Sequence, residues 1–254
     1  MYYVIGDIHG QYDMLISLMA KIEKEIDYEK DQLIFIGDYI DRGPDSNKVI
    51  SYIISLVSKY PNSVIPLMGN HEEMFNNYMM GIDEGVFIYN GGYQTIKSYN
   101  HKIPDEHIEF IKNKLKKFYV TENYFFIHGG INMVKNPNPK FEDLDLEEIV
   151  TTIDPSAEKP FYTEILWIRD LFLYKDFSNF GKTIVFGHTP FFEGKYISDI
   201  YVKYGKIGID TGAAYLDMGG KLSCIVLPSM KVIQIEKIAN ELELLKEMKE
   251  KYEG

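Results

Sequence analysis

The sequence has a single cysteine, Cys224, among its 254 residues, and this cysteine lies in the apolar run LSCIVL. One cysteine excludes an internal disulfide framework, which suits a reducing compartment, and its apolar neighbours predict a buried structural thiol. No apolar run approaches the ~18 residues of a transmembrane helix. The N-terminal stretch lacks the basic region and the cleavage site of a signal peptide. We therefore expect a cytoplasmic protein that does not associate with membranes.

Basic residues are in the minority. The 27 lysines and arginines face 38 aspartates and glutamates, and the formal net charge is −11 at pH 7. Nucleic acids and anionic membranes bind to basic surfaces, so this balance argues against both as partners. It does not exclude a small anionic substrate, because bound metal ions can invert the local field.

Strand and helix patterns alternate over the first third of the chain. Three short apolar runs, YYVIG, QLIFIG and SVIPLMG, are typical of strands buried on both faces, and a helical pattern follows each of them. The helical patterns cover residues 11–26 and 45–59 and begin again near His71. This repetition predicts an α/β sheet, in a single domain that spans residues 1–254.

The remainder of the chain departs from this alternation. The pattern of residues 72–118 indicates a helical excursion beside the sheet. Residues 135–161 hold four of the ten prolines, and their pattern indicates a surface loop with one short helical segment. The pattern of residues 163–172 favours a helix. From Tyr196 onward, short strands joined by tight turns predict a β-meander, and residues 236–251 an amphipathic C-terminal helix.

Polar side chains follow the predicted strands at the points where they end. In an open α/β sheet, ligands bind beyond the carboxyl ends of the strands, so these side chains are expected at one rim. They are Asp7, His9, Asp38, Asp41, Arg42, Asn70, His71, Glu72, His128, His188 and Asp210. Four of the six histidines belong to this set. The other two, His101 and His107, lie in a polar stretch that we expect to be exposed. For Asp210 we favour a structural role in its turn.

The donor types in this set indicate a metal site. Aspartate carboxylates, imidazoles and one asparagine carbonyl, with no thiolate, suit a divalent ion such as Mn²⁺, Fe or Zn²⁺. There are too many candidate ligands for one ion. Two ions ~3.5–4 Å apart that share one carboxylate fit the donors of a phosphoester-cleaving site.

Five motifs in order, GDIHG, GDYIDRG, GNHE, HGG and GHTP, resemble the signature of the calcineurin-like metallophosphoesterases. Within that superfamily the chain is similar to the bacterial and phage-type serine/threonine phosphoprotein phosphatases, of which the phage lambda phosphatase is one. The shorter matches NGGYQT, WIRD and DTGA agree. The resemblance covers roughly Tyr2 to Leu227. It implies a central β-sandwich of mixed sheets flanked by helices, with a dimetal site at the C-terminal ends of strands.

The resemblance also implies a role for each matching residue. Two divalent ions, with Mn²⁺ expected first and Fe or Zn²⁺ left open, would share Asp38. The implied metal ligands are Asp7, His9, Asp38, Asn70, His128 and His188. The implied catalytic residues are His71 as general acid, Asp41 to orient it, and Arg42 and Arg169 to bind the phosphoryl oxygens. One position departs from the pattern: Gly129 follows His128, where relatives often have alanine.

The expected reaction is a single in-line attack on phosphorus by a hydroxide held between the metal ions, with no phosphoenzyme. We expect a serine/threonine phosphoprotein or a small phosphate ester as substrate. Symmetrical hydrolysis of diadenosine tetraphosphate is the alternative, because the enzymes that catalyse it share the motifs. An inactive metal-binding scaffold is less favoured, since every motif residue is present, and a nuclease is less favoured again, given the acidic balance. The sequence leaves the oligomeric state open.

Overall fold

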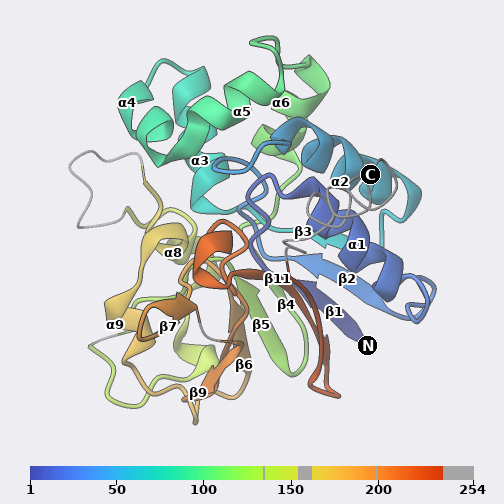
Figure 1. Cartoon of the computed structure of the whole chain (residues 1–254). Helices are drawn as coiled ribbons and strands as arrows, with labels where there is room; N and C mark the ends of the chain where they lie inside the picture. The colour runs from blue at the N-terminus through green and yellow to red at the C-terminus, as the bar shows by residue number, and fades with distance from the viewer. Residues whose placement is uncertain (134, 154–161, 198, 237–254) are drawn as a thin grey trace.

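The short apolar runs form two five-stranded mixed sheets, as seen in a computed structural model that describes residues 1–133, 135–153, 162–197 and 199–236 (Figure 1). The first sheet has the order β12-β11-β1-β2-β3 and the second the order β4-β5-β6-β10-β9. The strands of the first sheet are β1 (Tyr2–Ile5), β2 (Gln32–Phe35), β3 (Val64–Pro66), β11 (Lys221–Leu227) and β12 (Lys231–Glu236). Those of the second are β4 (Phe118–Val120), β5 (Tyr124–Ile127), β6 (Thr183–Phe186), β9 (Tyr201–Lys203) and β10 (Lys206–Gly208).

Each sheet has three neighbouring parallel strands. In the first, β1, β2 and β3 run parallel, and β11 and β12 add an antiparallel hairpin beside β1. In the second, β5, β6 and β10 run parallel, with β4 and β9 antiparallel at the two edges. A separate two-stranded ribbon pairs β7 (Phe192–Glu193) with β8 (Tyr196–Ile197). Parallel strands end together, so each sheet gathers its strand ends at one rim.

The core explains why the strands are apolar on both faces. Val4, Ile34 and Phe126 belong to the layer between the two sheets. Residues of opposite orientation, such as Ile5 and Phe35, pack in a second cluster that includes the buried faces of the first two helices. The second sheet likewise packs its outer face, including Phe125, in a third cluster. Cys224 is fully buried, which confirms the predicted structural thiol.

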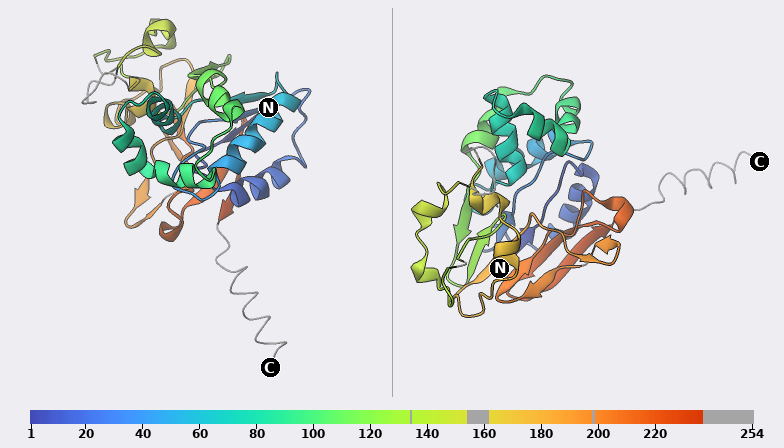
Figure 2. Two further views of the ribbon diagram at one scale, coloured as in Figure 1. Left: turned by 90° about the horizontal axis from the view of Figure 1, so that it is seen from above. Right: turned by 90° about the vertical axis from the view of Figure 1, so that its left-hand side faces the viewer.

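Helices flank this sandwich (Figures 1 and 2). Those of the first half are α1 (Tyr12–Ile22), α2 (Ser46–Lys59), α3 (Asn70–Met79), α4 (Glu84–Phe87), η1 (Ile88–Gly92), α5 (Tyr93–Ser98) and α6 (Asp105–Asn113). Those of the second half are η2 (Phe141–Asp143), α7 (Leu146–Ile149), α8 (Glu164–Trp167), α9 (Asp170–Leu173) and η3 (Leu216–Met218). Helices α1 and α2 lie against the first sheet, and α3 to α6 gather at one end of the sandwich. The mixed α/β sandwich that the motifs implied is therefore observed.

Three predictions from the sequence need correction. The strands after Tyr196 do not form one meander, because β9 and β10 join the second sheet whereas β11 and β12 join the first. The helix expected over residues 163–172 is interrupted at Ile168 and Arg169, where the backbone leaves helical geometry. His107 is buried rather than exposed, and its ring contacts the Tyr99 hydroxyl at 2.8 Å.

The C-terminal helix expected over residues 236–251 lies outside the described residues, apart from Glu236 at the end of β12.

Candidate metal centre

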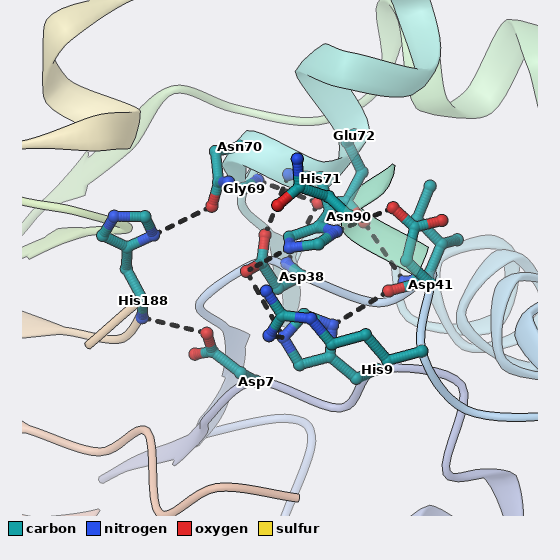
Figure 3. Close-up of polar contacts among 12 residues, drawn as sticks. Asp7, His9, Asp38, Asp41, Gly69, Asn70, His71, Glu72, Asn90 and His188 are labelled. Carbon is teal, nitrogen blue, oxygen red and sulfur yellow. Dashed lines mark hydrogen bonds and ion pairs between the residues drawn. The ribbon is translucent and has the colours of Figure 1, made fainter. Parts of the chain in front are cut away.

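The predicted ligands lie just beyond parallel strands of both sheets. Asp7 and His9 follow β1, Asp38 follows β2, and Asn70 opens α3 after β3. His128 and His188 follow β5 and β6 of the second sheet. All six are at most 4% exposed. Figure 3 shows the side chains of this rim turned toward one another. The structure therefore brings the six predicted ligands together, and both sheets contribute to this rim.

Many of these residues adopt strained backbone conformations. The φ angle is positive at His9 (47°), Asp38 (53°), Asp41 (71°), Arg42 (66°) and His188 (65°). Residues with a Cβ seldom occupy this region, and each such conformation persists only where the surrounding structure enforces it. Such strain gathers at functional sites.

Asp38 stands between two groups of candidate ligands. One group joins His9, Asp38 and His71, and the other joins Asp38, His128 and His188; in each, the ligand atoms lie within 4.8 Å of one another. The Asp38 Oδ2 atom is 3.6 Å from His9 Nε2, whereas its Oδ1 atom is 3.3 Å from His128 Nε2. Each carboxylate oxygen thus faces a different group, an arrangement that allows Asp38 to be shared between them.

Backbone carbonyls fix which ring nitrogen of each histidine faces inward. His9 Nδ1 lies 3.0 Å from the Ile40 carbonyl, His128 Nδ1 2.9 Å from that of Ile36, and His188 Nε2 3.2 Å from that of Trp167. A carbonyl oxygen can only accept, so each of these nitrogens carries the hydrogen. The opposite nitrogens present their lone pairs to the rim, as in metal-binding histidines.

These lone pairs converge with other electron-pair donors. Asn70 Oδ1 is 3.0 Å from His128 Nε2 and 2.8 Å from His188 Nδ1, although none of the three atoms carries a hydrogen in neutral rings. Asp7 Oδ1 is buried without a hydrogen-bond partner among the described residues. A side chain at Gly187 would overlap this oxygen, so only glycine fits there. Divalent cations would bind all of these atoms as ligands. The residues therefore fit the dimetal site that their donor types predict.

The electrostatics of the rim agree with this interpretation. Burial, Asp210 and Asp38 raise the pKa of Asp7 well above its ordinary value. Burial raises the pKa of Asp210 to about 6. Burial alone would raise the pKa of Asp38, but the charges of His128 and His71 hold it well below its ordinary value. Burial also lowers the pKa of His9. Burial opposes it, but the Asp38 carboxylate raises the pKa of His128. A cation bound here would replace this proton and stabilise the crowded carboxylates.

His71 and Asp41 form a hydrogen-bonded pair at the edge of the rim. His71 Nδ1 lies 2.7 Å from Asp41 Oδ2, and Asp41 is fully buried. The Thr95 hydroxyl donates to Asp41 Oδ1 at 2.6 Å, and the Asp41 amide donates to Thr95 Oγ1 and Ser46 Oγ. Burial lowers the pKa of His71 to about 3. Thr95 explains the motif NGGYQT, whose role the sequence alone did not reveal.

Glu72 supports the loop that carries Asp38, and sequence reasoning gave it no role. Its Oε2 atom accepts from the amides of Asp38 and Gly69, both at 2.9 Å, and its Oε1 atom from that of Tyr39 at 2.8 Å. Burial and the Asp38 charge raise its pKa to about 8. A glutamate three residues after a helix N-cap is the recognisable signal, because it can bond backwards to free amides.

The chain contains only two arginines among its 27 basic residues, and both are predicted to bind phosphoryl oxygens. Arg42 Nη1 is 3.0 Å from His9 Nε2, and its guanidinium lies 5.6 Å from the centre of the Tyr215 ring. Arg169 is exposed at the break between α8 and α9, and its charge helps to lower the pKa values of His188 and His71. A planar guanidinium fork matches phosphate oxygens in a way that lysine does not.

Asp210 accepts a hydrogen bond from the Gly212 amide at 2.9 Å and so closes its own turn.

Among the described residues, no helix has the length and apolar character to cross a bilayer.

A sandwich of two mixed sheets with carboxylate, imidazole and amide donors at a shared rim defines a metal-dependent phosphoesterase. The chain belongs to the calcineurin-like phosphoesterase family, whose sequence pattern matches residues 2–217. This membership makes it an enzyme of the metallophosphoesterase superfamily.

The chain is similar over its length to curated bacterial relatives. It is 26% identical over 252 residues to the asymmetrical bis(5'-nucleosyl)-tetraphosphatase PrpE of Bacillus velezensis, which covers 92% of each chain. The match to the PrpE of Bacillus cereus (strain Q1) is 27% identical over 252 residues, 92% of this chain and 93% of that one. A serine/threonine-protein phosphatase of Caenorhabditis elegans, C23G10.1, is 38% identical over 92 residues, 35% of this chain and 19% of that one.

Solved structures share the fold. A serine/threonine phosphatase from Saccharomyces cerevisiae superposes with a TM-score of 0.61 at 17% identity, over 94% of this chain and 80% of that chain. A cold-active protein tyrosine phosphatase gives a TM-score of 0.61 at 19% identity, over 92% and 75%. At these identities the likeness concerns the fold alone.

Proposed function

We propose that the protein is a phosphoric monoester hydrolase that acts on phosphoserine or phosphothreonine through a dimetal centre. The observation that carries this proposal is the buried pair of His71 and Asp41, 2.7 Å apart beside the metal ligands. Serine and threonine leave as strongly basic alkoxides, which need a proton in the transition state. When a phosphate anhydride is cleaved, the leaving group is a weakly basic phosphate, which needs no proton. A supported proton donor therefore suits an alkoxide leaving group. Because dinucleoside tetraphosphatases share the motifs that carry this pair, product analysis decides the substrate.

Each group of the site has a task in this reaction. When two divalent cations are bound, they supply an activated water at neutral pH and neutralise charge on the phosphoryl group. Arg42 and Arg169 bind phosphoryl oxygens and stabilise the same developing charge. Asp41 holds the His71 ring by its Nδ1 atom, and Thr95 holds Asp41. The opposite nitrogen of His71, Nε2, gives the proton to the leaving oxygen from the imidazolium form of the ring, which the Asp41 carboxylate and the phosphate dianion of a bound substrate stabilise against the burial that lowers its pKa.

A second candidate has its own support. The PrpE relatives are named asymmetrical bis(5'-nucleosyl)-tetraphosphatases and match 92% of this chain. A hydrolase of that type would cut the tetraphosphate chain of a dinucleotide off centre. The products would be a nucleoside triphosphate and a nucleoside monophosphate, whereas the symmetrical cleavage considered from the sequence would yield two diphosphates.

Product analysis separates the candidates. Metal-stripped protein is reconstituted with Mn²⁺ and assayed on phosphoserine and phosphothreonine peptides beside diadenosine tetraphosphate. We expect inorganic phosphate from the peptides. Formation of ATP and AMP from the dinucleotide, with no phosphate from any peptide, would replace the first candidate by the second. Formation of two ADP would favour symmetrical cleavage.

A further inference from the structure

The first turn of α3 presents four polar side chains in succession, and the metal centre and the His71 pair account for only three of them. Asn70 faces the metal ligands, His71 bonds Asp41, and Glu72 holds the Asp38 loop. Glu73 points to another part of the molecule. The residue is 7% exposed, and its carboxylate contacts the segment of residues 162–169, which we call the anchor segment.

Glu73 is held by donors from the anchor segment at two points. Its Oε2 atom accepts from the Thr163 amide at 3.0 Å and from the Trp167 indole nitrogen at 2.8 Å. Its Oε1 atom accepts from the Thr163 hydroxyl and, at 3.4 Å, from Lys117 Nζ. Thr163 lies 90 residues away in the chain. A buried carboxylate with this many donors fixes the segment that supplies them.

The anchor segment reaches the metal centre through Trp167. The Trp167 carbonyl accepts from His188 Nε2 at 3.2 Å, and the two rings have centroids 6.5 Å apart. This bond holds the lone pair of His188 Nδ1 toward Asn70. Arg169 follows two residues later, at the break between α8 and α9. The segment therefore orients one candidate metal ligand and carries one of the two arginines.

We propose that Glu73 is a positioning residue for His188 and Arg169, because it fixes the indole of Trp167 and thereby the carbonyl that orients His188. This role rests on the proposed dimetal function. A glutamine at position 73 holds these donors less tightly, since its neutral oxygen accepts more weakly than a carboxylate and its NH2 group would meet the Lys117 ammonium with hydrogens of its own.

The chain supplies a probe for this role, because Trp167 is its only tryptophan. In Glu73→Gln we expect a red-shifted Trp167 emission and an acrylamide quenching constant at least twofold higher. By calorimetric titration of the metal-stripped protein with Mn²⁺, one ion should bind about tenfold more weakly, the size of effect typical when the partner of a ligating histidine is lost. The other ion should bind within twofold of wild type.

Glu164→Gln is the matched control. Glu164 is buried in the same segment, but its Oε1 atom accepts from Asn132 Nδ2, which a glutamine oxygen can also do. We expect wild-type emission and Mn²⁺ affinity.

Trp167→Phe keeps a ring and removes the indole donor, so it should weaken the binding of the same ion about tenfold. The double variant Glu73→Gln/Trp167→Phe should be within twofold of either single variant. If Glu73→Gln does not fold, Trp167→Phe decides the test.

Three results would overturn the proposal. The first is a folded Glu73→Gln with the emission and the Mn²⁺ affinity of the wild type. The second is a changed emission while both Mn²⁺ ions bind within twofold of wild type. The third is a double variant in which the losses of Mn²⁺ affinity of the two single variants multiply. Failure of the proposed function would be distinct. In that case the wild type would bind two Mn²⁺ ions and release no phosphate from any peptide, while emission and affinity would still report on Glu73.

Discussion

At the scale of single residues, the site joins strained backbone to buried polar support. The left-handed conformations of Asp38 and Asp41 each cost of the order of 1–3 kcal/mol. Glu72 stabilises the Asp38 loop through three backbone amides, and Thr95 with Ser46 stabilises Asp41. A side chain at Gly69 would overlap Asp38 Oδ1, so the close approach of this carboxylate depends on glycine.

His71→Asn tests the proton donor. Because Nε2 of His71 is proposed to protonate the leaving oxygen, kcat on a phosphoserine peptide should fall by about 10²- to 10⁴-fold. On p-nitrophenyl phosphate, whose leaving group needs no proton, the loss should stay below about tenfold. Metal content, measured by mass spectrometry, should remain as in the wild type. An equal loss on both substrates, or loss of the metal ions, would contradict the assigned role.

At the scale of elements, the loops beyond parallel strands and the first residue of α3 position the candidate ligands, and short helices carry the second arginine and its support. The carboxyl end of α9 is capped by Lys206, which is 1% exposed. Its Nζ donates to the carbonyls of Phe172 (2.7 Å), Leu173 (2.8 Å) and Lys175 (2.8 Å). Burial lowers the pKa of Lys206 to about 8, yet three acceptors require three N–H groups, which only the ammonium form supplies.

Lys206→Met removes this cap and leaves three carbonyls, one buried and two partly buried, with fewer donors. Hydrogen bonds to a charged group contribute more than neutral ones, so the free energy of unfolding should fall by about 2–3 kcal/mol. Urea denaturation followed by circular dichroism measures this loss. Lys203→Met, at an exposed lysine of β9, is the control and should change stability by less than about 0.5 kcal/mol. Equal stability of the two variants would show that the cap contributes nothing.

The elements show where sequence reasoning succeeds. Apolar runs such as Leu33–Ile36 identify strands because burial on both faces leaves no polar position. The residues that end these strands identified the rim. Sequence could not show that β10 pairs with β6 rather than with β11, because short apolar strands carry no mark of their sheet. Nor could it show the break at Arg169, since a helical pattern continues through it.

The candidate ligands could be predicted from the sequence, whereas the residues that support them could not. Ligands such as Asp7 and His188 follow strands within short motifs. Glu72, Thr95 and Glu73 act on segments 33, 54 and 90 residues away, through backbone amides that every residue possesses. A local pattern does not name such a partner. The burial of His107 was missed in the same way, because Tyr99 and Ser51 cover it only after folding.

At the scale of the whole molecule, two sheets bring crowded carboxylates to one rim of an acidic chain. Without cations this arrangement costs stability. The pKa of Asp7 is raised in the folded state, so the folded protein holds the proton of this carboxyl group more tightly than the unfolded chain does. The free energy of unfolding therefore falls as the pH rises and Asp7 ionises. A bound cation reverses the effect.

Asp7→Asn should therefore stabilise the metal-free protein by about 1 kcal/mol near pH 7.5, or roughly 2–4 °C in Tm, with a smaller gain near pH 5. Mn²⁺ should raise the Tm of the wild type more than that of the variant. Differential scanning calorimetry at both pH values measures this. The exposed Asp217→Asn should shift Tm at neither pH. A variant less stable than metal-free wild type at pH 7.5 would refute the argument.

The most direct test of the account is the metal stoichiometry of wild type and Asp38→Asn. After metal removal and titration with Mn²⁺, elemental analysis of the wild type should find two ions per chain. Its electron paramagnetic resonance spectrum should show two coupled Mn²⁺ ions, because Asp38 presents one oxygen to each group of ligands. In Asp38→Asn the coupling and at least one ion should be lost. A single ion in the wild type, or two coupled ions in the variant, would contradict the account.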